Sequence, residues 1–556
     1  MPNINQQKLL KENENLKNEI RQLKSRKKYG LVWDSEKEPE KVVELCKERL
    51  PILTEESDKE IKTGGGEPVN VLIEGDNYHA LCVLNYTHKE KIDFIYIDPP
   101  YNTGSEGFLY NDRIVNREDS YRHSKWINFM DKRLRLAKNL LSKNGVIFIS
   151  IDDNEVAKLR MLCDEIFRED WVDLMIWRKS GVGRDGKMKN TTTFRKDHEY
   201  ILVIFKNQKR LNKIIETPDF KNEYGNPDND PRGAFKAGSI SLKEEASKIN
   251  HKNYYTVVSP SGKKFTRQFD IPKEDFDKLN DDILVSKQGK KVSRIYWGKN
   301  GDAVPSVKIY INEQREITPY SILMKGTTTE GTKELENILG DDFSSLRPKP
   351  VKLIKTLIQL GSQKDSLILD FFAGSGTTGQ ATLELNTEDG GNRQFILCTN
   401  DEGGICTDVC YPRMKKAILG FSGKEDGVKH PPLKAKLKYF KTDFVDGGAT
   451  DKNKKSLVDK STEMLCLKEN CFEEIARGKH FKMFKGNGKK HLGIVYDDDG
   501  IEPFKKEVKK LGENFAVYVF SLDESVREEE FEDVKDFVEL KPIPAVILNV
   551  YKRIFK

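Results

Sequence analysis

Short apolar segments that alternate with helical stretches are the feature that most constrains how this chain can fold. Near-continuous apolar runs of this length are typical of strands buried on both faces of a parallel sheet. The pattern therefore predicts a doubly wound, Rossmann-like α/β sheet. The runs in question are VNVLIEGD, KIDFIYID, GVIFISI, EYILVIF, SLILD and RQFILCTN.

The chain of 556 residues is well above the length at which one hydrophobic core stops growing, so several domains are expected. Leu9, Leu16 and Leu23 have heptad spacing, which predicts a short N-terminal coiled coil and a homodimer; a lone helix packed on its own chain is the alternative. The predicted parts are an N-terminal helix at 1–27, an extension and linker at 28–66, two halves of the sheet domain at 67–206 and 342–435, a turn-rich inserted domain between them at 207–341, and a smaller α/β domain at 436–556.

Composition narrows the class of protein. No apolar run is long enough to span a membrane and the first residues lack the features of a signal peptide, so a cytoplasmic protein is expected. The 8 cysteines are scattered, without a CxxC pair or a nearby histidine, and are expected to be reduced thiols rather than disulfides or metal ligands. The net charge is only +6, so any surface that binds nucleic acid must be locally basic.

The first candidate site is the sequence Asp98-Pro99-Pro100-Tyr101, which directly follows the strand KIDFIYID. The two prolines exclude a helix and fix the backbone, which leaves the Pro99 carbonyl free to accept a hydrogen bond. A carboxylate and a carbonyl can together accept both protons of an exocyclic amine, while the tyrosine ring stacks on a flipped base. An aspartate that caps a turn beside a packed tyrosine is the alternative interpretation.

The second candidate site is a glycine-rich turn after the strand SLILD. Asp370 ends this strand, and Gly374 and Gly376 follow before a predicted helix. Such a turn lets a cofactor lie against bare backbone, and the acid can anchor a polar group. Because GSGTTG also fits the dinucleotide fingerprint GxGxxG, a nicotinamide or flavin cofactor remains an alternative. Both motifs end strands of one predicted parallel sheet, so they are expected to face one crevice.

The order of these motifs resembles that of the amino-methyltransferases of the β arrangement, in which DPPY precedes the target-recognition region and the FxGxGT loop comes last. Further segments, including GDNYHAL, KDHEYILVIFKN and KYFKTDF, resemble the modification (Mod) subunits of type III restriction-modification systems. The resemblance implies a site-specific methyltransferase that moves a methyl group from S-adenosylmethionine to adenine N6 of double-stranded DNA. It also implies a separate restriction subunit with ATPase and nuclease activity, since this chain contains no GxxxxGK[ST] motif.

The same resemblance assigns roles to individual residues. Asp98 and the Pro99 carbonyl would hold the target amine, with Pro100 fixing the turn and Tyr101 stacking on the base. Adenine is favoured over cytosine because the acid of DPPY resembles the N6 enzymes. The family usually has a ribose-binding acid after the glycine loop, where this strand ends at Asn400 instead. The residues expected to border the cofactor are Asp76, Phe343, Lys349, Pro350, Asp370, Phe372, Gly374, Gly376, Thr377 and Asn400.

The inserted domain is predicted to recognise the target and contact DNA, because its basic residues are interleaved with aromatic ones. Residues 251–268 contain no acid, and a further basic group, Lys290, Lys291 and Arg294, follows soon after. A solvated charged surface is the alternative. The candidate DNA contacts are Lys252, Tyr254, Tyr255, Lys263, Lys264, Arg267, Lys290, Lys291 and Arg294.

Three other functions stay open at this point. A solitary DNA methyltransferase would have the same catalytic motifs but no cleaving partner. An NAD- or FAD-dependent oxidoreductase would use GSGTTG but leaves DPPY and the basic insert unexplained. A non-enzymatic DNA-binding module is disfavoured because both motifs are intact.

Overall fold

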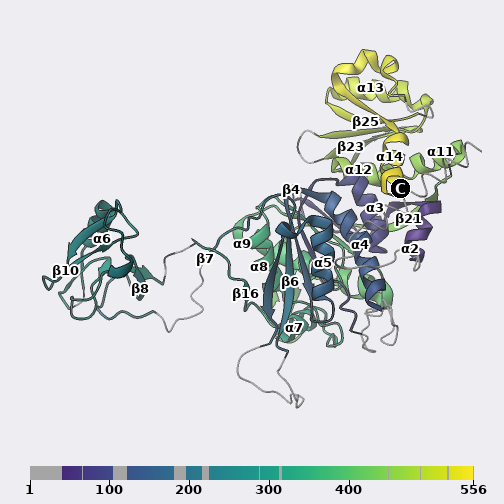
Figure 1. Ribbon diagram of the computed structural model, residues 1–556. Coiled ribbons are helices and arrows are strands. Elements are labelled where there is room, and N and C mark those ends of the chain that lie inside the picture. Colours follow the sequence, from purple (N-terminus) through teal and green to yellow (C-terminus); the bar gives the residue numbers. More distant parts are fainter. Residues whose placement is uncertain are drawn as a thin grey trace, which may run out of the picture. The chain divides into compact units, whose positions relative to one another are not determined.

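The computed structural model describes residues 40–554 with some gaps. The residues left out are 65–66, 104–121, 181–195, 216–223 and 522–524, and the single positions 287, 312, 314–315, 449, 487 and 489. The predicted coiled coil at 1–27 lies outside the described residues. The chain divides into two compact units: Met1–Asn212 with Tyr320–Lys556, and Lys213–Pro319 (Figure 1). Each unit has its own cluster of buried apolar side chains.

A ten-stranded mixed sheet forms the centre of the first unit, in the order β1-β21-β2-β18-β17-β3-β4-β6-β5-β16. From β21 to β4 all neighbouring strands are parallel, whereas β6 runs antiparallel to both β4 and β5. This arrangement confirms the predicted α/β class. The strands are β1 (Arg49–Glu55), β2 (Val69–Glu74), β3 (Ile92–Ile97), β4 (Leu141–Ile151), β5 (Val172–Arg178), β6 (His198–Phe205), β16 (Ile322–Leu323), β17 (Leu367–Asp370), β18 (Gln394–Thr399) and β21 (Lys436–Asp446), with a small hairpin of β19 (Phe421–Ser422) and β20 (Lys429–His430) beside them.

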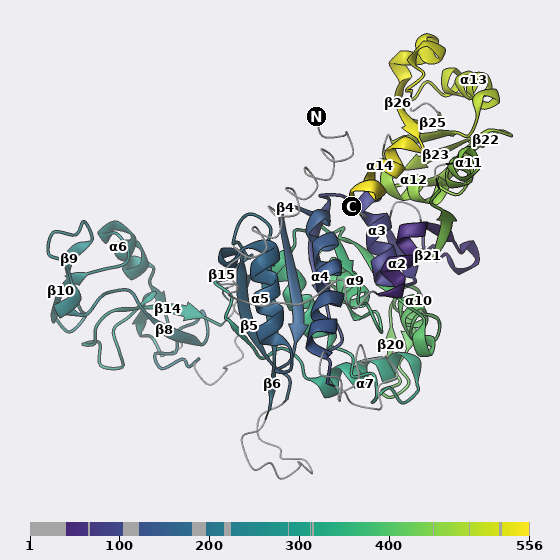
Figure 2. The ribbon, with the colours of Figure 1, turned by 45° about the vertical axis from the view of Figure 1, so that its right-hand side comes forward.

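Helices cover both faces of this sheet (Figure 2). Right-handed crossovers explain why: the chain moves one way along the sheet from β2 to β3 and β4, but the opposite way from β17 to β18, so the connecting helices lie on opposite faces. No helix within the described ranges is both long and apolar enough to span a membrane. The helices are α2 (Lys41–Glu48), α3 (Asn77–Thr87), α4 (Arg122–Leu140), α5 (Val156–Phe167), α7 (Thr328–Leu339), α8 (Val351–Gly361), α9 (Thr377–Asp389) and α10 (Tyr411–Leu419).

The second unit is a small β-rich domain around an aromatic core that includes Phe269, Phe276 and Trp297. Its first and last strands pair with each other, so its two ends lie together. The predicted insert was longer, because β16 and α7 pack within the first unit and not with this domain. The elements are β7 (Ile214–Ile215), β8 (Phe235–Ser239), β9 (Tyr254–Val258), β10 (Lys264–Gln268), α6 (Lys273–Asp281), β11 (Leu284–Val285), β12 (Lys291–Val292), β13 (Ile295–Tyr296), β14 (Ser306–Tyr310) and β15 (Glu316–Ile317).

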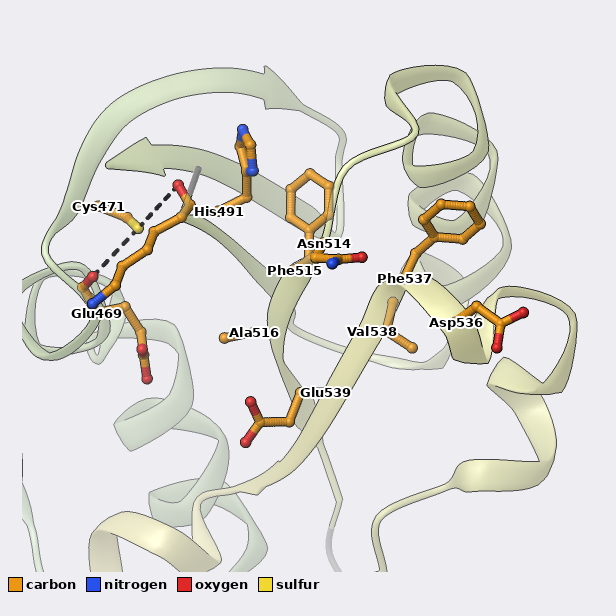
Figure 3. A pocket seen from close by; sticks show the side chains of 11 residues that line it. Glu469, Cys471, His491, Asn514, Phe515, Ala516, Asp536, Phe537, Val538 and Glu539 are labelled. Atoms are coloured by element: carbon orange, nitrogen blue, oxygen red, sulfur yellow. Dashed lines mark hydrogen bonds between the residues drawn. The ribbon is translucent and has the colours of Figure 1, made fainter. Parts of the chain in front are cut away.

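The C-terminal part of the first unit contains a separate five-stranded sheet in the order β22-β23-β24-β25-β26. Its helices α12 and α14 pack against α3, and the Tyr551 hydroxyl donates a hydrogen bond to the Pro51 carbonyl. An open pocket of about 440 Å³ lies at the amino ends of β24 to β26 (Figure 3), lined in part by His491, Phe515 and Val538. The elements are α11 (Asp451–Asp459), α12 (Thr462–Glu469), β22 (Cys471–Arg477), β23 (Phe481–Gly486), β24 (His491–Val495), α13 (Ile501–Leu511), β25 (Phe515–Phe520), β26 (Val538–Ile543) and α14 (Ala545–Ile554).

Candidate active site

The two sequence motifs lie side by side at one edge of the central sheet. β3 and β17 are adjacent parallel strands, with Ile95 beside Leu369. Asp370 ends β17, and Asp98 directly follows β3, so both acids lie at the carboxyl ends of neighbouring strands. In open parallel sheets ligands bind in the crevice beyond these ends.

Hydrogen bonds fix the turn that follows β3. The indole Nε1 of the fully buried Trp126, on α4, donates to the Pro100 carbonyl at 2.7 Å. The Tyr101 hydroxyl donates to Oδ1 of Asp98 at 2.8 Å. The turn ends at Asn102, which has a φ of 56° and donates to the buried Glu155 at 2.7 Å. The Asp98 carboxylate is therefore held against a rigid backbone.

Lys349 and Glu199 complete a charged cluster around Asp98. The Lys349 ammonium nitrogen lies 2.9 and 2.8 Å from the two Asp98 oxygens, 2.9 Å from the Tyr101 hydroxyl oxygen and 3.4 Å from Glu199 Oε2. The Tyr101 hydroxyl is also 3.1 Å from Glu199 Oε2. Lys179 donates to the other Glu199 oxygen at 3.1 Å. Two carboxylates and two ammonium groups are thus paired in a largely buried position.

Burial and charge pairing set the protonation of this cluster. Burial raises the pKa of Asp98, although Lys349 opposes the rise. Burial acts in the same direction on Glu199, but the lysines outweigh it and the pKa of Glu199 is lowered. Burial disfavours the charged form of Lys349, but Asp98 and Glu199 outweigh it and the pKa of Lys349 is raised. Lys349 is therefore an ammonium and Glu199 a carboxylate at neutral pH.

The glycine loop after β17 is organised by Asp370. One oxygen of this carboxylate accepts from the Phe372 backbone N–H at 3.0 Å and the other from the Thr378 hydroxyl at 2.5 Å. Burial raises the pKa of Asp370 to about 7. Gly374 and Gly376 have φ values of +49° and +81°, which favour glycine. Both Asp370 oxygens are thus used inside the loop.

The buried Arg413, near the start of α10, supports the same loop from behind. Its guanidinium donates to the Thr377 hydroxyl at 2.8 Å, to Ser375 Oγ at 3.1 Å and to Gln380 Oε1 at 2.8 Å. A Cβ built on Gly376 would lie 3.0 Å from Cys410 Sγ. The predicted cofactor residue Thr377 is therefore tied to the protein interior through its hydroxyl.

Asp76 caps the first turn of α3, where its Oδ1 accepts from the Tyr78 backbone N–H at 2.7 Å. The neighbouring Asn77 donates to the Phe371 carbonyl at 3.0 Å, which ties α3 to the glycine loop. Buried Arg133 lies 3.5 Å from Asp76 Oδ1. Asp76 thus lies beside the glycine loop at the carboxyl end of β2.

The remaining predicted cofactor residues lie on segments around this edge. Asn400 follows β18, and its neighbour Asp401 uses one oxygen to accept the backbone N–H groups of Cys406 and Thr407. Phe343 packs against a small cluster that includes Ile405. Pro350 is the N-cap of α8, which places Lys349 at the entry to that helix. Their contact with a cofactor stays a prediction.

The predicted DNA contacts on β9 and β10 of the second unit point to two opposite faces of these strands, because side chains alternate along a strand. Arg267 and Tyr255 pair across β9 and β10, while Lys264 and Tyr254 point to the opposite face of these strands. The Tyr255 ring stacks on Phe269 at 4.4 Å, so it belongs to the domain core. The exposed basic residues are Lys252, Lys263, Lys264, Lys290 and Lys291; Arg294, in contrast, is paired with Glu313.

Sequence reasoning did not single out Glu199, Lys179 or Arg413. Glu199 lies at the start of β6, and because β6 runs antiparallel to β4, this amino end lies at the same edge as the carboxyl ends of the parallel strands. An acid at the start of an apolar strand was the available signal, but the edge of the sheet at which it lies depends on the direction of the strand. Arg413 gave no signal beyond a basic residue on a helix.

Comparison with known proteins identifies a family. The sequence model of the DNA methylase family matches residues 92–404. The chain is 34% identical over 360 residues to the Mod subunit of the type III restriction-modification enzyme StyLTI of Salmonella typhimurium, covering 60% of this chain and 52% of that protein. It is 33% identical over 453 residues to the EcoPI Mod subunit of Escherichia phage P1, covering 72% and 68%.

A third relative is the type II methyltransferase M.KpnI of Klebsiella pneumoniae, which is 31% identical over 362 residues, covering 61% of this chain and 82% of that protein. The chain thus spans about half to four-fifths of the length of these relatives. These matches lend no support to an oxidoreductase. The DPPY turn and the glycine loop lie at the ends of adjacent strands, and the family's sequence model matches more than half of the chain. This chain therefore belongs to the DNA methylase family.

Proposed function

We propose that this chain is a site-specific DNA methyltransferase that transfers a methyl group from S-adenosylmethionine to N6 of adenine. The observation that carries the proposal is the fixed Asp98 carboxylate at the end of β3, next to the glycine loop that follows β17. The names of the relatives, which are methyltransferases or Mod subunits, support it. The aspartate in DPPY favours adenine over cytosine.

The glycine loop has the features that a cofactor needs. A Cβ built on Gly374 would meet no atom closer than the Phe372 carbonyl oxygen, at 3.9 Å, so the outer side of the loop is open to a ligand. S-adenosylmethionine would supply a methyl group on a positively charged sulfur. The loop backbone and Phe372 would hold its methionine end, while Asp76 and Asn400 offer polar groups for the adenosine end. Asp370 would act through the loop that it organises.

The protein residues would activate the amine by orientation. The lone pair of an exocyclic amine is delocalised into the ring, and hydrogen bonds from its two N–H groups to fixed acceptors localise it. Asp98 and the Pro99 carbonyl are the proposed acceptors, since Trp126 engages the carbonyl of Pro100. The Tyr101 ring would stack on the flipped base. No covalent bond to the enzyme is needed.

Target recognition is proposed for the second unit, because direct readout of base edges needs a surface other than the rigid catalytic crevice. Its exposed lysines would contact phosphates.

The similarity to Mod subunits supports a modification and specificity subunit of a type III system, with a separate restriction subunit. The similarity to M.KpnI favours, as second candidate, a methyltransferase without such a partner. We further propose a homodimer that works on DNA in the cytoplasm.

Sequencing that detects modified bases tests this proposal directly. DNA from cells that express the protein should contain N6-methyladenine at one recurring sequence, and DNA from cells with the empty vector should not. Methylation of cytosine N4 would correct the target base. DNA without any added methyl group, from cells that contain folded protein, would contradict the proposed function.

A further inference from the structure

Lys349 holds the position on Asp98 that the proposed function assigns to the target amine. Its ammonium nitrogen lies 2.9 and 2.8 Å from the two Asp98 oxygens and 2.9 Å from the Tyr101 hydroxyl oxygen. An ammonium and an exocyclic amine are both compact nitrogen donors that use the same lone pairs of a carboxylate. The base amine and the Lys349 ammonium therefore compete for Asp98.

A displaced Lys349 needs another anion within reach. Its side chain is only 10% exposed, and a buried ammonium without a partner is strongly unfavourable. Glu199 is such an anion: its side chain is 11% exposed, and its Oε2 lies 3.4 Å from the Lys349 nitrogen. A small rotation about the terminal bonds of the lysine closes this gap. The contacts for the displaced lysine are thus already built.

We propose that Lys349 is the resident occupant of the amine-binding position, and that Glu199 takes over its ammonium when the target base enters. This inference rests on the proposed function. The exchange leaves the net charge of the cluster unchanged, because Lys349 stays within it: Glu199 then holds Lys349 together with Lys179, while Asp98 orients an uncharged amine. Lys349 and Glu199 are positioning residues in this scheme, and only a base with an exocyclic amine can displace the lysine.

Binding experiments with two duplexes isolate the exchange. Both contain the methylated sequence found by sequencing, with either adenine or purine, which lacks the amine, at the target position. Affinity is measured with sinefungin as an unreactive cofactor analogue. Glu199→Gln should weaken binding of the adenine duplex about tenfold, because Lys349 then stays on Asp98, and should change binding of the purine duplex less than about twofold.

The Lys349→Met background supplies the decisive comparison. With Lys349 absent, Glu199→Gln should leave the ratio of adenine to purine affinity unchanged. Lys179→Met is the matched control, since Lys179 pairs with Glu199 but does not contact Asp98, and it should not lower the ratio. Thermal melting checks that each variant is folded, and Lys349→Gln replaces Lys349→Met if the latter is not.

Two outcomes would overturn the exchange and leave the methyltransferase proposal intact. An equal loss of adenine affinity in both backgrounds would mean that Glu199 acts independently of Lys349. A loss for both duplexes alike would assign Glu199 to the fold. If the folded wild-type protein adds no methyl group to DNA, both the exchange and the proposed function are wrong.

Discussion

At the scale of single residues, three carboxylates at this edge of the sheet, the buried Glu199 and Asp370 and the partly buried Asp98, differ in the groups that compensate their charge. Glu199 has two lysine partners and a lowered pKa, and Asp98 has Lys349 but a raised pKa. Within the described part of the chain, the Asp370 carboxylate accepts only from the uncharged groups of Phe372 and Thr378, and burial raises its pKa to about 7. Asp370 is therefore the group whose charge is least compensated.

The Asp370 carboxylate should make stability depend on pH. Its folded pKa is above that of the unfolded chain, so the stability that it contributes is complete at low pH and is lost as pH rises toward about 7. Asp370→Asn removes this titration. Between pH 5 and pH 8, calorimetric unfolding should show the wild type losing roughly 3 kcal/mol more than the variant. Asp365→Asn, at an exposed acid, is the control and should behave like the wild type.

Asp98 should be required for methyl transfer but not for cofactor binding. Asp98→Ala removes an acceptor of the target amine, so single-turnover transfer should fall at least about 100-fold, while calorimetry should find S-adenosylmethionine affinity roughly unchanged. Asp152→Ala is the matched control, because Asp152 directly follows the next strand, β4, and its carboxylate accepts hydrogen bonds only from Asn154 among the described contacts. Transfer by Asp98→Ala at the wild-type rate would contradict the proposed role.

At the scale of elements, the position of Lys349 depends on close packing between α7 and the segment before α8. A Cβ built on Gly331 of α7 would lie 2.2 Å from the Pro348 carbonyl oxygen, and one on Gly326 would lie 2.7 Å from the Pro350 ring. Side chains at these positions would push the segment away. The lysine is thus placed by two helices, while Asp98 and Glu199 are placed by two strands.

The two glycines of the cofactor loop should respond differently to alanine. The protein itself limits the space at Gly376, because a Cβ there would lie 3.0 Å from Cys410 Sγ. Gly376→Ala should therefore lower the melting temperature. Gly374 faces open space, so Gly374→Ala should cost about 1 kcal/mol of stability but weaken S-adenosylmethionine binding at least about tenfold by calorimetry. Unchanged affinity in Gly374→Ala would mean that the cofactor does not approach this loop.

At the scale of the whole molecule, the chain separates a rigid catalytic sheet from a domain with its own core. The pairing of β7 with β15 closes the second unit at its base, so the domain can be exchanged without opening its fold. The exposed lysines among the candidate DNA contacts lie outside that core, whereas Tyr255 packs against it.

Exchange of Lys213–Pro319 for the corresponding domain of a relative should change the methylated sequence and leave the methylated base unchanged, because base readout and amine chemistry use different surfaces. Modified-base sequencing measures both. A folded chimera that still methylates the original sequence would move target recognition into the first unit. A chimera that keeps cofactor affinity but methylates nothing would mean that the donor domain no longer presents DNA to this catalytic sheet.

The sequence by itself determined the α/β sheet and its two motifs. Apolar runs such as KIDFIYID have no stable place other than a buried strand, and consecutive prolines or closely spaced glycines restrict the backbone wherever they occur. These are local constraints, so Asp98, Tyr101 and Asp370 could be identified before their surroundings were known. The direction of β6 was not local, since an antiparallel strand has the same alternation of side chains as a parallel one.

Only the tertiary structure brought Lys349 and Glu199 to Asp98, and it ended the inserted domain at Pro319, earlier than the turn-rich sequence indicated. Each of these facts depends on contacts between segments that are far apart in the chain. Charge pairing of this kind leaves no periodic pattern in a sequence, because a buried ion pair is decided by which surfaces meet after the sheet has formed.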